Sequence, residues 1–230
     1  MKTDIDHLMK ERNLDALFVS GSTRDNPAMY YLTNGAKIGE YSLLIKKQNT
    51  DAILIVIGME RDEASISGLQ IIERSHFNLP KLLQDECGNK LVAHARMLIS
   101  IFQELEVNGR VGVYGREEQG FTLALFKELE SRLPDLTFVG ESTPNLIQTA
   151  QITKNEQEMR RIRDLSERAL KVISETRNYI STHTVNDGQI MTKKGIPLTI
   201  GDIRSRILRW SLENNLENPE GLIFAAGRDA

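Results

Sequence analysis

Hydrophobic and polar positions along the first two thirds of the chain predict an α/β domain. Short apolar runs bounded by turn residues indicate strands at 16–20, 41–46, 52–57, 69–72, 110–114 and 136–139. Apolar residues at helical spacing predict helices at 3–13, 26–33, 90–107 and 117–132, with Thr3 and Pro27 as starting signals for the first two. A short polar segment joins strands 41–46 and 52–57, so we expect an antiparallel hairpin within a mixed sheet.

The pattern changes near residue 150. Thr153 and Glu156 have the spacing of a capping box, and apolar residues then recur at helical spacing over about 28 residues. Turns are expected at 186–188 and 193–195, followed by a helix from Thr199 to about Asn215. We therefore place a boundary near 145–152. It separates an α/β domain over residues 1–150 from a mainly helical part over residues 151–230.

The last apolar run, residues 221–226 (GLIFAA), predicts a buried strand. A strand satisfies its backbone polar groups by pairing with a neighbour, and the pattern predicts mainly helices after residue 153. We therefore expect residues 153–230 to begin a domain whose other strands lie beyond Ala230. Leu222, Ile223 and Phe224 would then be core residues of that domain, and residues 153–230 would expose apolar surface.

The composition excludes several classes of function. The chain has 230 residues, a formal net charge of −3 and 40% hydrophobic residues, so it lacks the basic footprint of a nucleic-acid-binding protein. The longest apolar stretch, residues 52–59, is far too short to span a membrane, and the N-terminus has no apolar signal core. Cys87 is the single cysteine, which excludes an intrachain disulfide and favours a reducing, cytoplasmic setting.

Residue types that carry chemistry form no complete active site. The four histidines have no partners at metal-ligand spacing; they are His7, His76, His94 and His183. Residues 112–120 (GVYGREEQG) lie at a strand-to-helix turn, where phosphate loops occur, but Glu117 and Glu118 occupy the place of an anion. We therefore expect these two glutamates to complement the helix dipole, and Cys87 to be inert.

The polar loop after the first strand is the one candidate pocket. Asn26, Tyr30 and Tyr31 border it. Ligands favour the carboxyl ends of strands in α/β folds, so these residues are candidates for a substrate-access loop. A structural role for all three is the favoured alternative.

The order of the elements resembles the creatinase/prolidase/Xaa-Pro aminopeptidase family. The segments that carry this resemblance are 14–19 (LDALFV), 26–35 (NPAMYYLTNG), 109–114 (GRVGVY), 136–139 (LTFV), 145–147 (NLI), 154–163 (KNEQEMRRIR) and 218–230 (NPEGLIFAAGRDA). The resemblance implies an N-terminal mixed-sheet α/β domain of creatinase type. It also implies that residues 151–230 are the incomplete, mainly helical start of a pita-bread α+β domain.

The resemblance implies a metallopeptidase that hydrolyses the Xaa-Pro bond of short peptides with proline at the second position. Family members hold two divalent metal ions, usually manganese, cobalt or zinc, with two Asp, one His and two Glu, and these ions activate a bridging water. None of the five ligands maps onto this chain, so we assign no catalytic and no metal-binding residue. We expect the 230 residues alone to bind no metal and to be inactive.

The partners follow from the same resemblance. We expect a homodimer that acts on short peptides, with no nucleic acid and no membrane as partner. Three other functions remain open. They are a non-catalytic pita-bread module for binding or dimerisation, a creatinase-like amidinohydrolase, and a free-standing α/β domain for small ligands with a helical appendage.

Overall fold

The computed structural model describes residues 4–219 and 221–227. The chain divides into two compact units, Met1–Thr153 and Lys154–Ala230. No helix in the described residues is both long enough and apolar enough to cross a membrane. Each unit is described by itself below.

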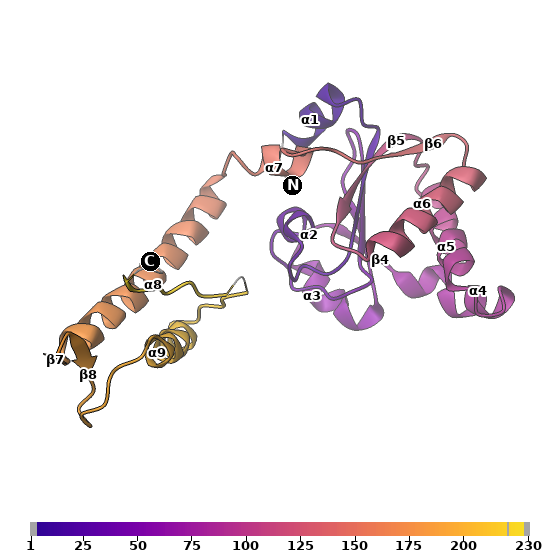
Figure 1. Cartoon of the computed structure of the whole chain (residues 1–230). Coiled ribbons are helices and arrows are strands. Elements are labelled where there is room, and N and C mark those ends of the chain that lie inside the picture. The colour runs from indigo at the N-terminus through magenta and orange to yellow at the C-terminus, as the bar shows by residue number, and fades with distance from the viewer. Residues whose placement is uncertain (1–3, 220, 228–230) are drawn as a thin grey trace. The chain divides into compact units, whose positions relative to one another are not determined.

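A six-stranded mixed sheet forms the centre of the first unit (Figure 1). The strand order is β4-β3-β2-β1-β5-β6, and β2 is antiparallel to both neighbours while the other neighbouring pairs are parallel. The six strands are β1 (Ala16–Ser20), β2 (Leu43–Lys47), β3 (Ile53–Val56), β4 (Gln70–Glu73), β5 (Gly109–Gly115) and β6 (Leu136–Val139). The predicted mixed sheet and its 41–57 hairpin are therefore confirmed.

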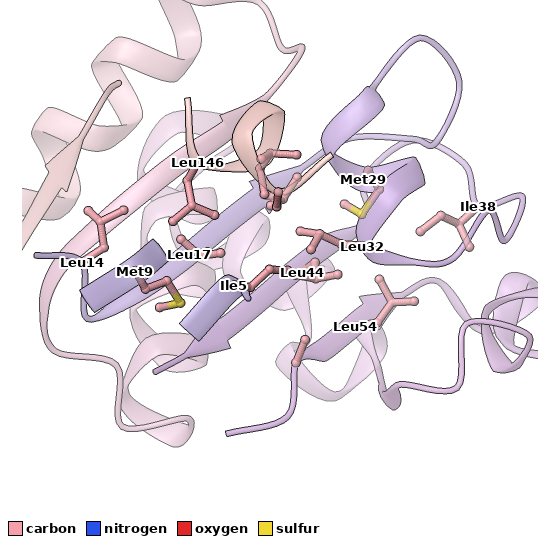
Figure 2. Packing of buried hydrophobic residues seen from close by; sticks show 14 of the residues in the cluster. Ile5, Met9, Leu14, Leu17, Met29, Leu32, Ile38, Leu44, Leu54 and Leu146 are labelled. Carbon is pink, nitrogen blue, oxygen red and sulfur yellow. The ribbon is translucent and has the colours of Figure 1, made fainter. Parts of the chain in front are cut away.

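Helices cover both faces of this sheet because successive strand residues point to opposite sides. On the first face, Leu17 and Val19 of β1 lie in a core with residues of α1 (Ile5–Glu11), α2 (Pro27–Leu32), α3 (Arg61–Ser65) and α7 (Leu146–Ala150). Figure 2 shows this core from close by.

On the second face, Ala16 and Phe18 of β1 pack with residues of α4 (Leu79–Asp85), α5 (Lys90–Glu104) and α6 (Gln119–Arg132). Aromatic rings fill much of this side, where the Phe126 ring stacks on Phe138 and meets Phe18 edge to face. The first unit is therefore a three-layer α/β/α sandwich.

The helix starts follow the local sequence. Pro27 occupies the first position of α2, as predicted, and Asn26 caps the helix by accepting a hydrogen bond from the Met29 N–H. Glu118 caps α6 by accepting from the N–H groups of Gly120 and Phe121. The start of α1 follows Asp4, and the predicted cap Thr3 lies outside the described residues.

The second unit contains a long helix, a short hairpin and a second helix. These are α8 (Glu156–Ser181), β7 (Thr184–Asn186), β8 (Gln189–Met191) and α9 (Ile200–Glu213). Val172 of α8 packs against Ile203 and Ile207 of α9. One detail of the prediction is wrong: Asn155 and Glu158 form the capping box of α8, in place of Thr153 and Glu156. The predicted turn at 186–188 is confirmed, and it joins two short strands that were not predicted.

The strand predicted at residues 221–226 is wrong, because these residues make no strand pairing in the described part of the chain. Leu222 and Phe224 pack beside the core of the second unit, whereas Ile223 is 96% exposed. The predicted exposure of apolar surface is confirmed. The large exposed apolar side chains of α8 and α9 are Met159, Ile162, Leu165, Leu170, Ile173, Ile200, Leu208 and Leu212.

Candidate functional site

The carboxyl ends of five parallel strands meet at one edge of the sheet, together with the amino end of β2. We call this edge the carboxyl edge. From β1 the chain runs to β2, β3 and β4 on one side, and β5 then pairs with β1 on the other. Where the strand order reverses in this way, the loops that follow the two neighbouring strands run in opposite directions and leave a crevice between them. Ligands of α/β proteins bind in this crevice. The candidate site therefore lies where β1 and β5 end.

Asn26 fixes the loop that follows β1. Its side chain is buried, and its Nδ2 donates a hydrogen bond to the carbonyl of Ser20 at 2.8 Å, while its Oδ1 accepts from the Met29 N–H at 3.3 Å. The residue thus joins the end of β1 to the start of α2. Its amide nitrogen and its amide oxygen both make hydrogen bonds to the backbone. Asn26 would therefore contribute to a site by fixing the shape of the loop.

Tyr30 and Tyr31 point to different surroundings on α2. The Tyr31 hydroxyl donates to the carbonyl of Ala150 at 3.0 Å, which ties α2 to α7. The Tyr30 side chain is 54% exposed, and its ring lies so close to Gly35 that a Cβ there would meet the ring at 3.2 Å. A substrate-access role for this loop stays a prediction, and Tyr30 presents the most exposed side chain of the three predicted residues.

Two glycines allow the loops after β1 and β5 to approach each other. Gly115 has φ +138°, and a Cβ there would lie 2.5 Å from the carbonyl oxygen of Ser20. Gly21 has φ +104°, and a Cβ there would lie 3.0 Å from a carboxylate oxygen of Glu117 and 3.2 Å from the Asn26 amide nitrogen. The Glu117 carboxylate therefore lies against the loop that Asn26 holds.

Arg74 follows β4 directly and reaches the same edge. Its Nη1 donates to the carbonyl of Tyr41 at 2.9 Å, and its guanidinium carbon lies 5.3 Å from the centre of the Tyr41 ring. Its Nε is buried and has no hydrogen-bond partner among the described residues. Burial lowers the pKa of Arg74, and the nearby Tyr41 and Glu117 oppose that effect. The group remains a cation at neutral pH.

Glu117 is a carboxylate without a bonding partner among residues 4–219 and 221–227. Much of its side chain is exposed, but its carboxyl group faces the Gly21 loop, and this partial desolvation raises its pKa. Repulsion by Glu40 raises the pKa further, while Arg74 lowers it. Glu40, Tyr41, Arg74 and Glu117 form what we call the carboxyl-edge cluster. Its two carboxylates and one guanidinium make it acidic overall.

A second polar network has a structural role. The Tyr114 hydroxyl donates to Glu141 at 2.5 Å, and Arg12 Nη1 donates to the same carboxylate at 2.6 Å. Burial and this hydrogen bond raise the pKa of Tyr114. Burial alone would raise the pKa of Glu141, but hydrogen bonds from Tyr114, the Leu146 N–H and Arg12 lower it. The network joins α1, β5 and the start of α7, and its groups are satisfied by one another.

The described residues contain no group of three or more His, Cys, Asp and Glu side chains that could hold a metal ion. The carboxyl-edge cluster brings together two carboxylates, but the third charged member is an arginine. The donor set does not fit the two divalent ions implied by the resemblance, and we derive no metal-dependent step from it.

The carboxyl-edge cluster was missed in the sequence because its members come from three loops far apart along the chain. The sequence predicts that Glu117 and Glu118 both complement the dipole of α6; Glu118 caps that helix, whereas Glu117 makes no hydrogen bond among the described residues. One sequence feature does point to the cluster. Arg74 comes directly after β4 and Glu117 comes shortly after β5, and the carboxyl ends of both strands lie at the same edge of the sheet.

The first unit is thus an α/β/α domain whose parallel sheet contains one antiparallel strand, with a polar cluster at its carboxyl edge. The sequence model of the Creatinase/Prolidase N-terminal domain matches residues 3–148. The chain belongs to this family. A comparison with curated proteins gave no match.

Solved structures of peptidases share the fold. An X-Pro aminopeptidase from Thermotoga maritima aligns with a TM-score of 0.58 and 16% identity over 90% of this chain and 49% of its own. A dipeptidase from Pyrococcus horikoshii aligns with a TM-score of 0.56 and 16% identity, over 91% and 49% of the two chains. A prolidase from Thermococcus sibiricus gives 0.55 and 12%, over 90% and 47%. The chain therefore spans about half the length of these structures.

Proposed function

We propose that this chain is the N-terminal part of a metal-dependent peptidase that hydrolyses Xaa-Pro bonds. The observation that carries the proposal is the family match over residues 3–148. The α/β/α fold and its similarity to an X-Pro aminopeptidase, a dipeptidase and a prolidase support it. At 12–16% identity these similarities establish the fold, so the activity itself is the proposal.

The proposal divides the work between two parts of a longer protein. Two divalent metal ions, manganese, cobalt or zinc, would supply an activated water and polarise the scissile carbonyl. Their ligands would come from sequence other than these 230 residues. The α/β domain would narrow access to that centre, so that short peptides with proline at the second position are accepted. The loop bordered by Asn26, Tyr30 and Tyr31 belongs to this part of the proposal.

A homodimer in the cytoplasm completes the proposal. The single cysteine of the sequence fits a reducing compartment. Light scattering after size-exclusion chromatography would give twice the mass of one chain if the protein is a homodimer. A single-chain mass at all concentrations would contradict this part, without bearing on the peptidase activity.

The metal content of the longer protein tests the proposal. The protein that contains this chain together with any sequence following Ala230 would be purified, stripped of metal and reloaded with manganese. We expect about two ions per chain and five ligands, two Asp, one His and two Glu, in the added sequence. An added sequence that lacks these ligands and binds no metal would instead support a non-catalytic module.

A further inference from the structure

The carboxyl-edge cluster contains a guanidinium whose best binding edge is unused. Nη1 of Arg74 donates to the Tyr41 carbonyl at 2.9 Å. The opposite edge, formed by Nε and Nη2, has no hydrogen-bond partner in the described part of the chain, although Nε is buried. Buried polar groups are nearly always hydrogen-bonded, so an unpaired one calls for a partner. Nε has almost no accessible surface, so a ligand carboxylate meets Arg74 first through Nη2, and the side-on contact to both nitrogens requires Nε to become uncovered on binding.

The Arg74 side chain is held in place before any ligand arrives. The Tyr41 carbonyl fixes one end of the guanidinium, and the Tyr41 ring lies beneath it with its centre 5.3 Å away. An arginine that is already ordered loses little side-chain entropy on binding. Its free edge is therefore a prepared binding group, unlike that of a solvated surface arginine.

The two carboxylates of the cluster do not neutralise Arg74 directly. Glu117 is close enough for its charge to act on Arg74, yet the two form no ion pair within 4.0 Å among the described residues. Glu40 repels Glu117, and the Glu117 carboxyl group is partly desolvated against the loop of Gly21. Two repelling carboxylates attract a cation, and an ammonium group between them would relieve the repulsion.

We propose that the carboxyl-edge cluster binds a small zwitterion, a free amino acid or short peptide, with the ligand carboxylate on Arg74 and its ammonium group on Glu117 and Glu40. The ligand class follows from the juxtaposition of one positive and two negative groups at one edge. A simple anion would be repelled by the two glutamates, and a simple cation would leave Arg74 unpaired. The inference does not depend on the proposed peptidase activity, because the site is built from residues of this chain alone.

A titration with three matched peptides tests the inference. Ala-Ala carries both charges, N-acetyl-Ala-Ala carries the carboxylate, and Ala-Ala-amide carries the ammonium group. Amide chemical shifts of the isotope-labelled 230-residue chain would be followed at neutral pH. We expect Ala-Ala to shift the amides of Tyr41, Arg74 and Glu117 together, and each blocked peptide to bind at least about tenfold more weakly.

Variants separate the site from unspecific binding. Glu117→Gln and Arg74→Gln should each weaken Ala-Ala binding by about tenfold or more. Glu117 makes no hydrogen bond in the described part of the chain, so Glu117→Gln should keep the fold even if Arg74→Gln does not. Glu106→Gln is the matched control, because Glu106 is exposed and lies just before β5, at the opposite edge of the sheet.

Three results would overturn the inference. They are the absence of shifts at the cluster, equal binding of the free and blocked peptides, and unchanged binding in a folded Glu117→Gln variant. None of these outcomes bears on Xaa-Pro hydrolysis by the longer protein, so the two proposals fail separately.

Discussion

Lys46 is a charged residue with no exposed surface. Its Nζ donates to Asp6 at 2.7 Å, to the Thr50 carbonyl at 2.8 Å and to the Lys47 carbonyl at 3.2 Å. All three donors of the ammonium group are therefore used. This ion pair links the first helix to the turn between β2 and β3. Loss of Asp6 and loss of Lys46 should therefore lower the free energy of unfolding by different amounts.

Asp6→Ala should destabilise the first unit by about 3 kcal/mol, because it leaves a buried ammonium without its counter-charge. Lys46→Met should cost less, about 1 kcal/mol, since it removes the buried charge, keeps the apolar stem and leaves Asp6 with 34% of its side chain exposed. Urea denaturation of both variants measures the two costs. Equal losses, or a larger loss for Lys46→Met, would contradict the assignment.

Gly115 is required by the close approach of β5 to β1. Gly115→Ala would place a Cβ 2.5 Å from the Ser20 carbonyl oxygen at a φ of +138°, so we expect a loss of about 2 kcal/mol. Gly140→Ala is the control, because a Cβ at Gly140 meets no described atom within 4 Å, and its effect should stay within about 0.5 kcal/mol. Thermal unfolding of the two variants compares them, and similar melting temperatures would refute the steric account.

Glu117 and Glu118 are neighbours whose pKa values shift in opposite directions. Desolvation and Glu40 raise the pKa of Glu117, so the folded state holds its proton more tightly than the unfolded state does. This contribution favours folding at low pH and is lost as pH rises from the ordinary glutamate value through the raised one. Backbone hydrogen bonds from Phe121 and Gly120 lower the pKa of Glu118, so its contribution is present above the ordinary value and lost as pH falls.

We therefore predict that the two variants change stability with pH in opposite directions. Relative to the unchanged chain, Glu117→Gln should gain stability as pH rises above the ordinary glutamate value, because the raised pKa of Glu117 lies there. Glu118→Gln should lose stability as pH rises toward that value from below, because the lowered pKa of Glu118 lies there. Urea denaturation at several pH values gives both differences. Slopes of the same sign would show that the local surroundings of one glutamate are misassigned.

At the scale of elements, α8 begins where its cap satisfies the free backbone donors. Asn155 accepts from the Glu158 N–H at 2.9 Å, and the Glu158 carboxylate accepts from the Asn155 N–H at 2.8 Å. Asn155→Ala should cost about 1 kcal/mol, whereas Asn155→Asp should cost a few tenths because aspartate caps equally well. Hydrogen exchange in the first turn of α8 reports the difference. Equal exchange in both variants would exclude the Asn155 cap.

Most elements of the chain could be predicted from the sequence, whereas three short helices and one short hairpin could not. Strands β1 to β6 are apolar runs with clear turns, and α5 and α9 have a distinct apolar face. Helices α3, α4 and α7 have five to seven residues, which is too short for helical periodicity to be visible. The capping box was misplaced by two residues because Thr153-Lys-Asn155 offers two possible caps before the same apolar face.

The candidate site is harder to predict than the fold. Its residues lie close together in space but come from separate loops, so no short stretch of sequence shows that they meet. Arg74 and Glu117 are more than forty residues apart in the sequence. Only the strand order brings their loops to one edge, and that order depends on β5 pairing with β1 across the whole of the β2–β4 segment. Asn26 is predicted only as a residue that borders the loop after the first strand, and its capping of α2 is seen in the structure.

At the scale of the whole molecule, the two units differ in how much apolar surface they bury. The first has two cores, one on each face of its sheet, whereas the core of the second has three buried apolar residues. Apolar side chains such as Leu170, Ile173 and Leu212 are more than half exposed. This contrast fits the proposal that the second unit belongs to a larger pita-bread domain.

The most direct test of that proposal is peptide hydrolysis by two proteins compared side by side. One is the 230-residue chain, and the other is the same chain with the metal-binding half that the proposal requires. Each would be incubated with manganese and either Ala-Pro or Pro-Ala, and released amino acids would be measured. We predict cleavage of Ala-Pro, and not of Pro-Ala, by the longer protein, and no cleavage by the 230 residues. Hydrolysis by the 230-residue chain, or none by the metal-loaded longer protein, would contradict the account.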